Sequence, residues 1–516
     1  MSTHIIRERE VLERFLVDES SYTGHAEGVV FVESAEQVAA VLKQASAEGT
    51  PITFSARRTS LTGAAIPEGG LVLALPEPSE PEMVSVDRDN ARATAPAQVL
   101  WSDVELAAEA AGLFLPPDPT SRKTCSIGGS VACNASGARS FAHGPTGAWV
   151  EGLTVALTTG DVVKLRRGEH PPVNGHFHLD LPSGPLKIPA PGPRRADIKN
   201  SLGYATFPDP DLIDLFIGSE GTLGYIHEVD LRLAPGVEVF AALVFWDDLD
   251  KALSFVEQLQ GTRAADHTGP LKPMSVEWFD RASLELAAAR HPRFAVPEGA
   301  VAALFVEQGH SAAEADDVME AWYMALLEAG VPEDEAYLRM PTSKAQLDAF
   351  RDFRHAVPES INALARQRGL RKLGTDLAYP AGWLQDMVAH YHAALADVPG
   401  TLGTEAAKAF EAEWGRPLPQ TLDAAAFGHI GDNHLHVNML PNDKAEAAAG
   451  KLMYAALAQH CAQAGGVISG EHGIGKSKRD LLAATLTEDQ LEQMRAIKAV
   501  LDPAGILGVG NLFASR

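Results

Sequence analysis

Apolar and polar positions near the start of the chain predict a strand, a helix and a second strand. Residues 28–32 form a short apolar run that is typical of a buried strand. Ser34 is placed to cap the N-terminus of a helix, and Gly49 is placed to end it. Residues 51–54 predict the next strand. The pattern therefore predicts a β-α-β beginning.

Later segments predict further strands at 71–75 and around 153–157. After about residue 236 the pattern alternates between short apolar runs and longer amphipathic stretches, which predicts an α+β domain with a helix-covered antiparallel sheet. The predicted strands are 240–246, 274–279, 300–308, 335–340, 375–379 and 434–440. The predicted helices are 249–260, 313–329, 344–366, 382–396, 443–464 and 488–501, the last beginning with a capping-box pair, Thr487 and Gln490.

Changes in composition predict the domain boundaries. A stretch rich in Pro, Gly and His, at about 166–197, predicts a surface insertion. We expect a first domain over residues 1–235, a second over 236–465, and a C-terminal segment over 466–516.

Charge and cysteine content exclude several classes of protein. The chain has 516 residues and a formal charge of -25, which argues against nucleic acid as a partner. Its three cysteines, Cys125, Cys133 and Cys461, are too few for a disulfide framework or an iron–sulfur cluster. No apolar run approaches the ~20 residues that span a bilayer, and the N-terminus lacks an apolar signal core. We therefore expect a cytoplasmic protein without a transmembrane segment.

Three segments of the first half, 58–65, 116–137 and 217–224, are rich in Gly, Ala, Ser and Thr. Glycine lets backbone N–H groups approach phosphate oxygens, and hydroxyl groups add donors. None of the segments matches the dinucleotide fingerprint or a P-loop, and each alone is also explained by a tight turn. Three of them in one domain favour a large cofactor that contains a pyrophosphate.

Two segments near the C-terminus, 428–438 and 469–475, combine histidines with an acidic residue and glycines. His434 and His436 share one face of the predicted strand because side chains alternate along it. A turn at Gly431-Asp432-Asn433 can bring His429 to the same place. Imidazole and carboxylate groups are ligands of divalent metals, although structural histidines are the alternative.

These motifs resemble the flavoproteins of the vanillyl-alcohol oxidase / p-cresol methylhydroxylase fold, in the branch of D-lactate, glycolate and D-2-hydroxyglutarate dehydrogenases. The resemblance covers residues from about 24 to 513, and its most specific strings are Gly-Ser-Glu-Gly-Thr-Leu-Gly at 218–224 and Ser-Gly-Glu-His-Gly at 469–473. It implies an α+β chain, with a two-part FAD-binding domain followed by an α+β substrate domain. The residues that it implies for FAD binding are Arg58, Thr59, Ser60, Gly63, Pro117, Asp118, Ser121, Gly128, Gly129, Asn134, Ala135, Gly137, Gly218, Glu220, Gly221, Gly224 and Asn511.

The first loop departs from the family pattern, because Ser55 and Arg58 stand where Arg and Gly are usual. We expect Arg57 and Arg58 to face the FAD phosphates. The usual setting for covalent attachment of FAD is missing, so we expect non-covalent FAD, with His143 as the residue to check.

The resemblance also implies a divalent metal held by His429, His436 and Glu471. Zinc is the first candidate, with manganese or iron as alternatives. His434 stands where the family usually has another residue and adds either a ligand or a donor to the substrate. His472 is implied as the general base, since its intrinsic pKa suits that role.

For the substrate carboxylate the resemblance implies Arg354, because an arginine can hold a carboxylate through two hydrogen bonds. Lys372 is a second candidate, with a solvated loop lysine as the alternative.

The implied activity is oxidation of a D-2-hydroxy acid, such as D-lactate, to the 2-keto acid with hydride transfer to the flavin N5. An external acceptor (a quinone, a cytochrome, an electron-transfer flavoprotein or oxygen) would take the electrons. The alternatives are a flavoprotein subunit of a glycolate or lactate oxidase complex, a flavoenzyme for phenolic or sugar substrates, and a metal-dependent hydrolase. A homodimer and peripheral attachment at the inner face of the membrane are compatible with this interpretation.

Overall fold

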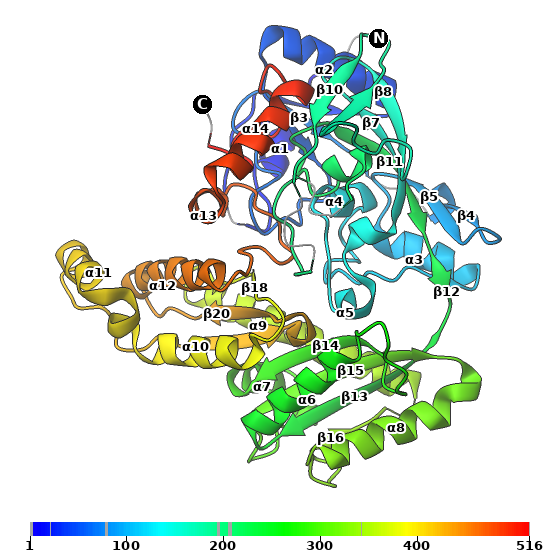
Figure 1. The fold of residues 1–516 in the computed structure, drawn as a ribbon. Helices are drawn as coiled ribbons and strands as arrows, with labels where there is room; N and C mark the ends of the chain where they lie inside the picture. Colours follow the sequence, from blue (N-terminus) through cyan, green and yellow to red (C-terminus); the bar gives the residue numbers. More distant parts are fainter. Residues whose placement is uncertain are drawn as a thin grey trace. The chain divides into compact units, whose positions relative to one another are not determined.

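The computed structural model describes residues 4–20, 22–77, 81–192, 197–204, 209–341 and 343–514. The chain forms two compact units, with the elements labelled in Figure 1. Unit 1 comprises Met1–Gly137, Gly144–Gly236 and Ser469–Arg516, and unit 2 comprises Ala138–His143 and Val237–Ile468. Within the described residues, no helix combines the length and the apolar character needed to cross a bilayer.

Unit 1 begins with the predicted β-α-β elements: β1 (Gly28–Phe31), α2 (Ala35–Glu48) and β2 (Ile52–Ser55). The Ser34 side chain accepts a hydrogen bond from the Gln37 N–H, and Gly49 ends the helix in a left-handed conformation, as predicted. A third parallel strand, β3 (Leu71–Ala74), lies between β1 and β2. The buried face of α2 packs on this sheet and closes a small core.

A second, antiparallel sheet of unit 1 has the strand order β4-β5-β11-β7-β8. Its strands are β4 (Ser85–Asp87), β5 (Arg92–Pro96), β7 (Val150–Ala156), β8 (Val162–Arg166) and β11 (Tyr225–Arg232). Short helices α3 (Trp101–Ala110) and α4 (Ile127–Ala132) connect β5 to β7, and β6 (Leu113–Phe114) pairs with β12 (Ala234–Pro235). The predicted insertion contains a hairpin of β9 (His176–Leu179) and β10 (Leu186–Pro189), and its residues 193–196 lie outside the described residues.

The C-terminal segment returns to unit 1. It contains α13 (Arg479–Thr485) and α14 (Glu488–Leu501), and the latter has the predicted capping box of Thr487 and Gln490. Beyond α14 the chain pairs with β2, where the Ile52 N–H donates to the Ile506 carbonyl at 2.8 Å. Unit 1 is therefore assembled from both ends of the chain.

Unit 2 is built on one antiparallel sheet with the order β16-β13-β15-β14-β19-β20-β17, and β18 also pairs with β20. The strands are β13 (Glu238–Trp246), β14 (Pro273–Asp280), β15 (Ala302–His310), β16 (Leu338–Arg339), β17 (Leu373–Gly374), β18 (Leu377–Ala378), β19 (Ala424–Gly428) and β20 (His434–Met439). The helices are α6 (Leu249–Gly261), α7 (Arg281–Ala288), α8 (Ala315–Glu328), α9 (Lys344–Gln367), α10 (Leu384–Ala396), α11 (Val398–Trp414) and α12 (Lys444–Gln463).

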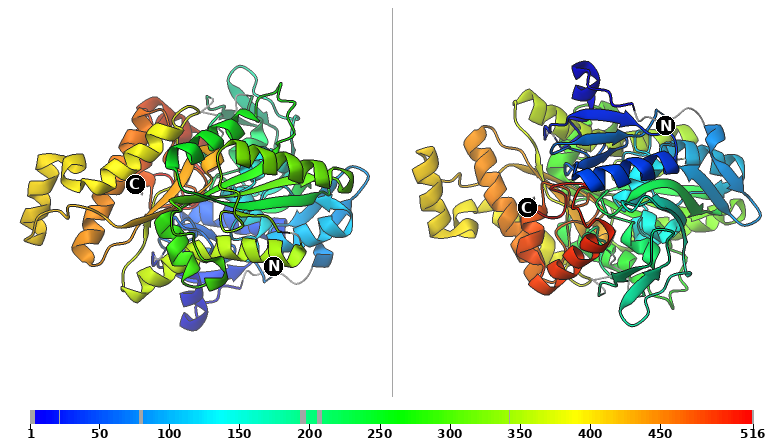
Figure 2. Two further views of the ribbon diagram at one scale, coloured as in Figure 1. Left: turned by 90° about the horizontal axis from the view of Figure 1, so that it is seen from below. Right: turned by 90° about the horizontal axis from the view of Figure 1, so that it is seen from above.

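Helices cover both faces of this sheet (Figure 2). Phe245 and Phe279 point to the face that packs with Phe353 of α9 in the core of unit 2. On the opposite face, Trp246 contacts Phe255 of α6. The structure thus confirms the predicted antiparallel sheet covered by helices.

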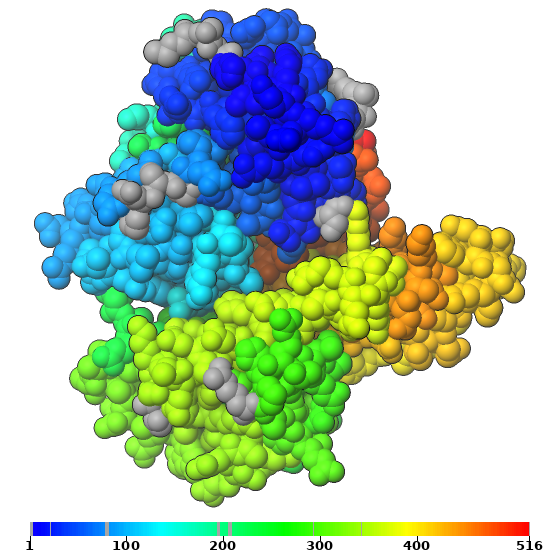
Figure 3. All heavy atoms as spheres, turned by 180° about the vertical axis from the view of Figure 1, so that it is seen from behind, coloured from blue at the N-terminus to red at the C-terminus, as the bar shows by residue number. Residues whose placement is uncertain are grey.

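The helix α11, which was not predicted, packs against α10 and α12 at the margin of unit 2 (Figure 3). Gly403 inside it has non-helical angles (φ 81°, ψ 169°), so the segment consists of two short helices across a kink. The interruption breaks the 3.6-residue period by which a helix is predicted. The predicted strands at 335–340 and 375–379 shorten to the two-residue strands β16 and β18.

Candidate functional site

The second glycine-rich segment of unit 1 folds with very close backbone approaches. A Cβ atom at Gly137 would lie 1.7 Å from the Asp118 carbonyl oxygen, and one at Gly128 would lie 2.4 Å from the Ala97 Cβ. Neither position can hold a larger residue without displacement of the chain. Glycine is therefore required at these two positions because the segment packs directly against other parts of unit 1.

Glu220 ties the third segment to the rest of unit 1. Its backbone N–H donates to the Ala132 carbonyl at 2.8 Å, which joins the second and third segments. Its carboxylate accepts hydrogen bonds from the Ile474 N–H at 2.7 Å and the Gly475 N–H at 2.6 Å. Burial raises the pKa of Glu220 to about 7, although these two N–H groups oppose the rise. FAD contact is a prediction for Glu220, whereas the bonds of its carboxylate in the structure go to the backbone of the C-terminal loop.

The first segment is held by hydroxyl and amide groups. The Ser60 hydroxyl accepts from the Thr62 N–H and the Ala64 N–H, each at 3.2 Å. Asn511 donates from its side chain to the Ala64 carbonyl at 2.8 Å and to the Glu220 carbonyl at 3.1 Å. Asn511 therefore links the first and third segments. The guanidinium of Arg58 lies over the Phe15 ring at 4.8 Å.

The other predicted FAD-binding residues lie in the same three segments, which these bonds bring together. The Asn134 side chain accepts from the Gly147 N–H at 2.9 Å, and the Asp118 carboxylate accepts from Arg122 at 2.7 Å. The first segment also holds Thr59 and Gly63, the second holds Pro117, Ser121, Gly129 and Ala135, and the third holds Gly218, Gly221 and Gly224. The residues present fit a large phosphate-bearing cofactor. His143 falls in α5 (Ser140–His143), a segment of unit 2.

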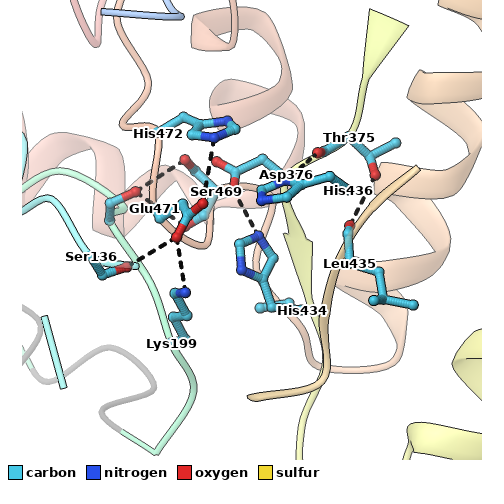
Figure 4. Close-up of polar contacts among 12 residues, drawn as sticks. Ser136, Lys199, Thr375, Asp376, His434, Leu435, His436, Ser469, Glu471 and His472 are labelled. Atoms are coloured by element: carbon cyan, nitrogen blue, oxygen red, sulfur yellow. Dashed lines mark hydrogen bonds and ion pairs between the residues drawn. The ribbon is translucent and has the colours of Figure 1, made fainter. Parts of the chain in front are cut away.

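Glu471 and His472 lie in the C-terminal part of unit 1 (Figure 4). One carboxylate oxygen of Glu471 contacts the ammonium of Lys199 at 2.9 Å and the hydroxyl of Ser136 at 3.3 Å. The other oxygen lies 3.6 Å from Nε2 of His472, whose side chain is 25% exposed. Neither Lys199 nor Ser136 was predicted, because each is more than 250 positions from Glu471 in the chain.

Three histidines cluster inside unit 2. His434 and His436 lie on β20, and His429 lies just before a short turn in which Asn433 adopts a left-handed conformation (φ 51°). One ring nitrogen from each histidine lies within 4.8 Å of the others. All three side chains are buried. The predicted turn thus brings His429 beside the other two, and the donor set fits a divalent metal.

Each imidazole of the cluster is oriented by a hydrogen-bond partner. Nδ1 of His429 contacts the Glu277 carboxylate, and Nε2 of His434 contacts the Asp376 carboxylate at 2.8 Å. Nδ1 of His436 contacts the Thr375 carbonyl at 3.1 Å (Figure 4). Metal-binding histidines almost always have such a partner on the nitrogen that does not bind the metal.

Arg354 reaches the same cluster through Glu277. It projects from α9, and its Nε donates to the Glu277 carboxylate at 2.8 Å. Glu277 therefore bridges Arg354 and His429. Burial by itself would raise the pKa of Glu277, but His429 and Arg354 outweigh it and hold the pKa well below its usual range.

Glu277 was not predicted, although an acidic residue inside the apolar strand β14 is a sequence signal for a buried charge with a partner. Lys372, the other candidate for the substrate carboxylate, is half-buried just before β17.

A cavity of about 420 Å³ lies on the other side of β20. Leu435 and Val437 line it, together with Trp278 and Asp280. Because side chains alternate along a strand, this cavity is on the face opposite to His434 and His436. The side chains with candidate chemistry therefore lie outside it.

The glycine-dependent loops of unit 1 and the buried histidines and arginine of unit 2 are the features that the sequence predicted for a cofactor-dependent oxidoreductase. The chain belongs to the FAD-linked oxidases: residues 237–512 match the model "FAD linked oxidases, C-terminal domain", and residues 26–166 match "FAD binding domain". This confirms the family inferred from the motifs and identifies the cofactor as FAD. The expectation of a divalent metal depends on the histidine cluster, because the family descriptions do not mention a metal.

Relatives match over nearly the whole chain. A D-lactate dehydrogenase of Anaerostipes hadrus is 29% identical, with 98% of this chain and 93% of the relative covered. A D-2-hydroxyglutarate dehydrogenase of Xanthomonas citri pv. viticola is 30% identical (94% and 88% covered), and the glycolate oxidase subunit GlcD of Bacillus subtilis is 28% identical (96% and 90%). Among solved structures, alkyldihydroxyacetonephosphate synthase has a TM-score of 0.63 at 15% identity, covering 98% of this chain and 81% of that chain. This likeness concerns the fold and agrees with the predicted fold class.

Proposed function

We propose that this chain oxidises a D-2-hydroxy acid to the 2-keto acid with FAD and passes the electrons to an external acceptor. The observation that carries the proposal is the buried group of His429, Glu277 and Arg354, next to His434 and His436, in a chain of the FAD-linked oxidase family. An arginine beside imidazoles suits a small substrate that has a carboxylate and a neighbouring hydroxyl group. Relatives named for D-lactate and D-2-hydroxyglutarate support the same class of substrate.

The proposed roles divide between the two units. Bound FAD, held non-covalently, supplies the two-electron acceptor. His472 takes the proton of the substrate hydroxyl at Nε2, a role that suits its partial exposure of 25%. Arg354 binds the substrate carboxylate, while Glu277 fixes the guanidinium. Lys372 is the second candidate for the carboxylate.

For the metal we propose His429 and His436 as ligands, with Glu471 added from the sequence resemblance and His434 as a ligand or a donor to the substrate. The carboxylate and carbonyl partners of the three imidazoles support this set. Zinc is the first candidate, with manganese and iron as alternatives. A bound divalent ion lowers the pKa of a hydroxyl group that it contacts.

A second candidate function is that of a flavoprotein subunit in a larger oxidase. The observation that favours it is that the relatives from Bacillus subtilis and Escherichia coli are named as the GlcD subunit of glycolate oxidase. The proposed acceptors are a quinone, a cytochrome or an electron-transfer flavoprotein. A homodimer and a cytoplasmic location, with or without contact with the inner face of the membrane, complete this proposal.

The test is an anaerobic visible spectrum of the purified protein before and after addition of D-lactate, L-lactate, glycolate and D-2-hydroxyglutarate, each alone. We expect an oxidised flavin spectrum that bleaches with a D-isomer and stays unchanged with L-lactate. Bleaching by none of the acids would refute the proposal for the isolated chain and favour the subunit role. Bleaching by both isomers of lactate would refute the stereochemical part.

The role of His472 has a separate test. His472→Ala should keep the flavin spectrum while the rate of flavin reduction by the substrate falls by about 10²–10⁴-fold. His178→Ala is the control, since His178 is an exposed histidine of β9 in the same unit. A reduction rate equal to that of the control would remove His472 as the base.

A further inference from the structure

Lys199 is a buried lysine whose charge is directed at Glu471. Its side chain is 4% exposed and that of Glu471 is 9% exposed, and their charged atoms lie 2.9 Å apart. The same ammonium donates to the Gly137 carbonyl at 3.5 Å. Burying two charges costs free energy that a pair seldom returns in full, so such a pair is weak evidence for a role in stability. A role in fixing one orientation explains it better.

The backbone around Lys199 is fastened to the same loop. The Ser201 N–H donates to the Ser469 carbonyl at 2.9 Å, and the Gly473 N–H donates to the Ser201 hydroxyl at 3.0 Å. The hydroxyl groups of Ser201 and Ser469 lie 3.1 Å apart. The segment that carries Lys199 is therefore hydrogen-bonded to the C-terminal loop both before Glu471, at Ser469, and after it, at Gly473.

The two oxygens of Glu471 have different neighbours (Figure 4). Lys199 and the Ser136 hydroxyl both contact one oxygen, at 2.9 and 3.3 Å. The other oxygen is the one nearer to His472, at 3.6 Å. Rotation of the carboxylate would break both contacts to the first oxygen. The orientation of the second oxygen is therefore set by Lys199 and Ser136.

We propose that Lys199 is a positioning residue, which holds Glu471 by one oxygen so that the other is preorganised as a metal ligand beside His472. The inference rests on the proposed function, in which Glu471 is a ligand. Groups that hydrogen-bond a metal-ligating carboxylate typically change metal affinity 10–100-fold when they are lost. Nothing in the sequence around position 199 marks it as part of this site.

The experiment compares Lys199→Met with the wild type as full-length, FAD-loaded protein without substrate. Zinc affinity is measured by competition with a chromogenic chelator. We expect the variant to bind Zn²⁺ about 10–100-fold more weakly. An unchanged or tighter affinity would overturn the inference, and so would a wild type that binds no zinc.

Lys498→Met is the matched control, because it removes another lysine–carboxylate pair of unit 1, Lys498 with Asp502 at 2.7 Å, whose side chains are 17% and 0% exposed. We expect both variants to lower the melting temperature, but Lys498→Met should leave the zinc affinity unchanged. If both variants weakened zinc binding equally, the effect would be general destabilisation and the inference would fail.

Two further variants test whether Lys199 acts through Glu471. In a Glu471→Gln background, Lys199→Met should have no additional effect on zinc affinity, because coupled residues are non-additive. If Lys199→Met does not fold, Ser136→Ala removes the other contact to the same oxygen, and an affinity equal to wild type would overturn the inference. Failure of the hydroxy acids to bleach the flavin would refute the proposed function without changing these affinities.

Discussion

Glu277 offers the sharpest test of how the histidine cluster is held. It is buried, and its two oxygens bond to different partners, Arg354 at 2.8 Å and His429 at 2.5 Å. Glu277→Gln keeps the shape of the side chain but removes the charge. The amide also places an N–H₂ group against one of two donors, so at least one bond of the network is lost.

The expected loss follows from the burial of this network. Removing one charged partner of a buried pair destabilises a protein by about 3–5 kcal/mol. Glutamine retains one acceptor, so we expect a value near the lower limit, about 3 kcal/mol. For a unit of this size, 1 kcal/mol corresponds to about 2–4 °C, so unit 2 should melt about 6–12 °C lower.

The assay is differential scanning calorimetry together with zinc affinity. Glu285→Gln is the control, because Glu285 also pairs with an arginine, Arg281, but their side chains are 59% and 39% exposed. An exposed pair contributes less than about 1 kcal/mol, so this variant should melt close to the wild type. Zinc binding should weaken about 10–100-fold in Glu277→Gln alone. If the two variants had the same melting temperature and zinc affinity, the reasoning about the buried bridge would be wrong.

Three further predictions concern other parts of the chain. The folded state raises the pKa of Glu220 from 4.5 to about 7, so about 3 kcal/mol of stability that is present below pH 4.5 is lost once the pH has risen past 7. Glu220→Gln should therefore reduce the fall in melting temperature between pH 5 and pH 8. An unchanged fall would contradict the assignment. Gly137→Ala should abolish FAD retention or folding, as shown by flavin absorbance per chain, whereas Gly261→Ala, whose Cβ would meet nothing within 4 Å, should retain FAD. Arg354→Met should raise KM and lower kcat/KM for the hydroxy acid by a factor that corresponds to roughly 2–4 kcal/mol of transition-state free energy. Unchanged steady-state kinetics would remove Arg354 from the site.

The ends of helices α2 and α14 could be predicted from the sequence because they are set by residues only a few positions apart. The cap at Ser34, the stop at Gly49 and the capping box at Thr487 each depend on residues within a few positions, and the structure has all three. The kinked helix α11 was missed because Gly403 breaks the period from which a helix is recognised.

The candidate site was predictable where its residues are close in the sequence. The turn at Asn433 and the alternation along β20 gave the grouping of the three histidines. The partners that orient these groups could not be predicted, because Glu277 is 152 positions from His429. Such pairs depend on which strand lies beside which, and a short strand carries no signal of its neighbour. The roles assigned to these residues stay predictions.

The discontinuity of unit 1 has a consequence for its synthesis. Ile52 bonds to Ile506, and Asn511 bonds to Ala64, so the first part of unit 1 acquires these partners only after the whole of unit 2 has been translated. At about 5–20 residues per second, the ribosome needs on the order of 10–50 s to pass from residue 236 to residue 469. During that interval the nascent first part exposes the apolar side chains that Ile506 and Leu507 later cover. Unit 2, whose main segment is continuous, can fold first.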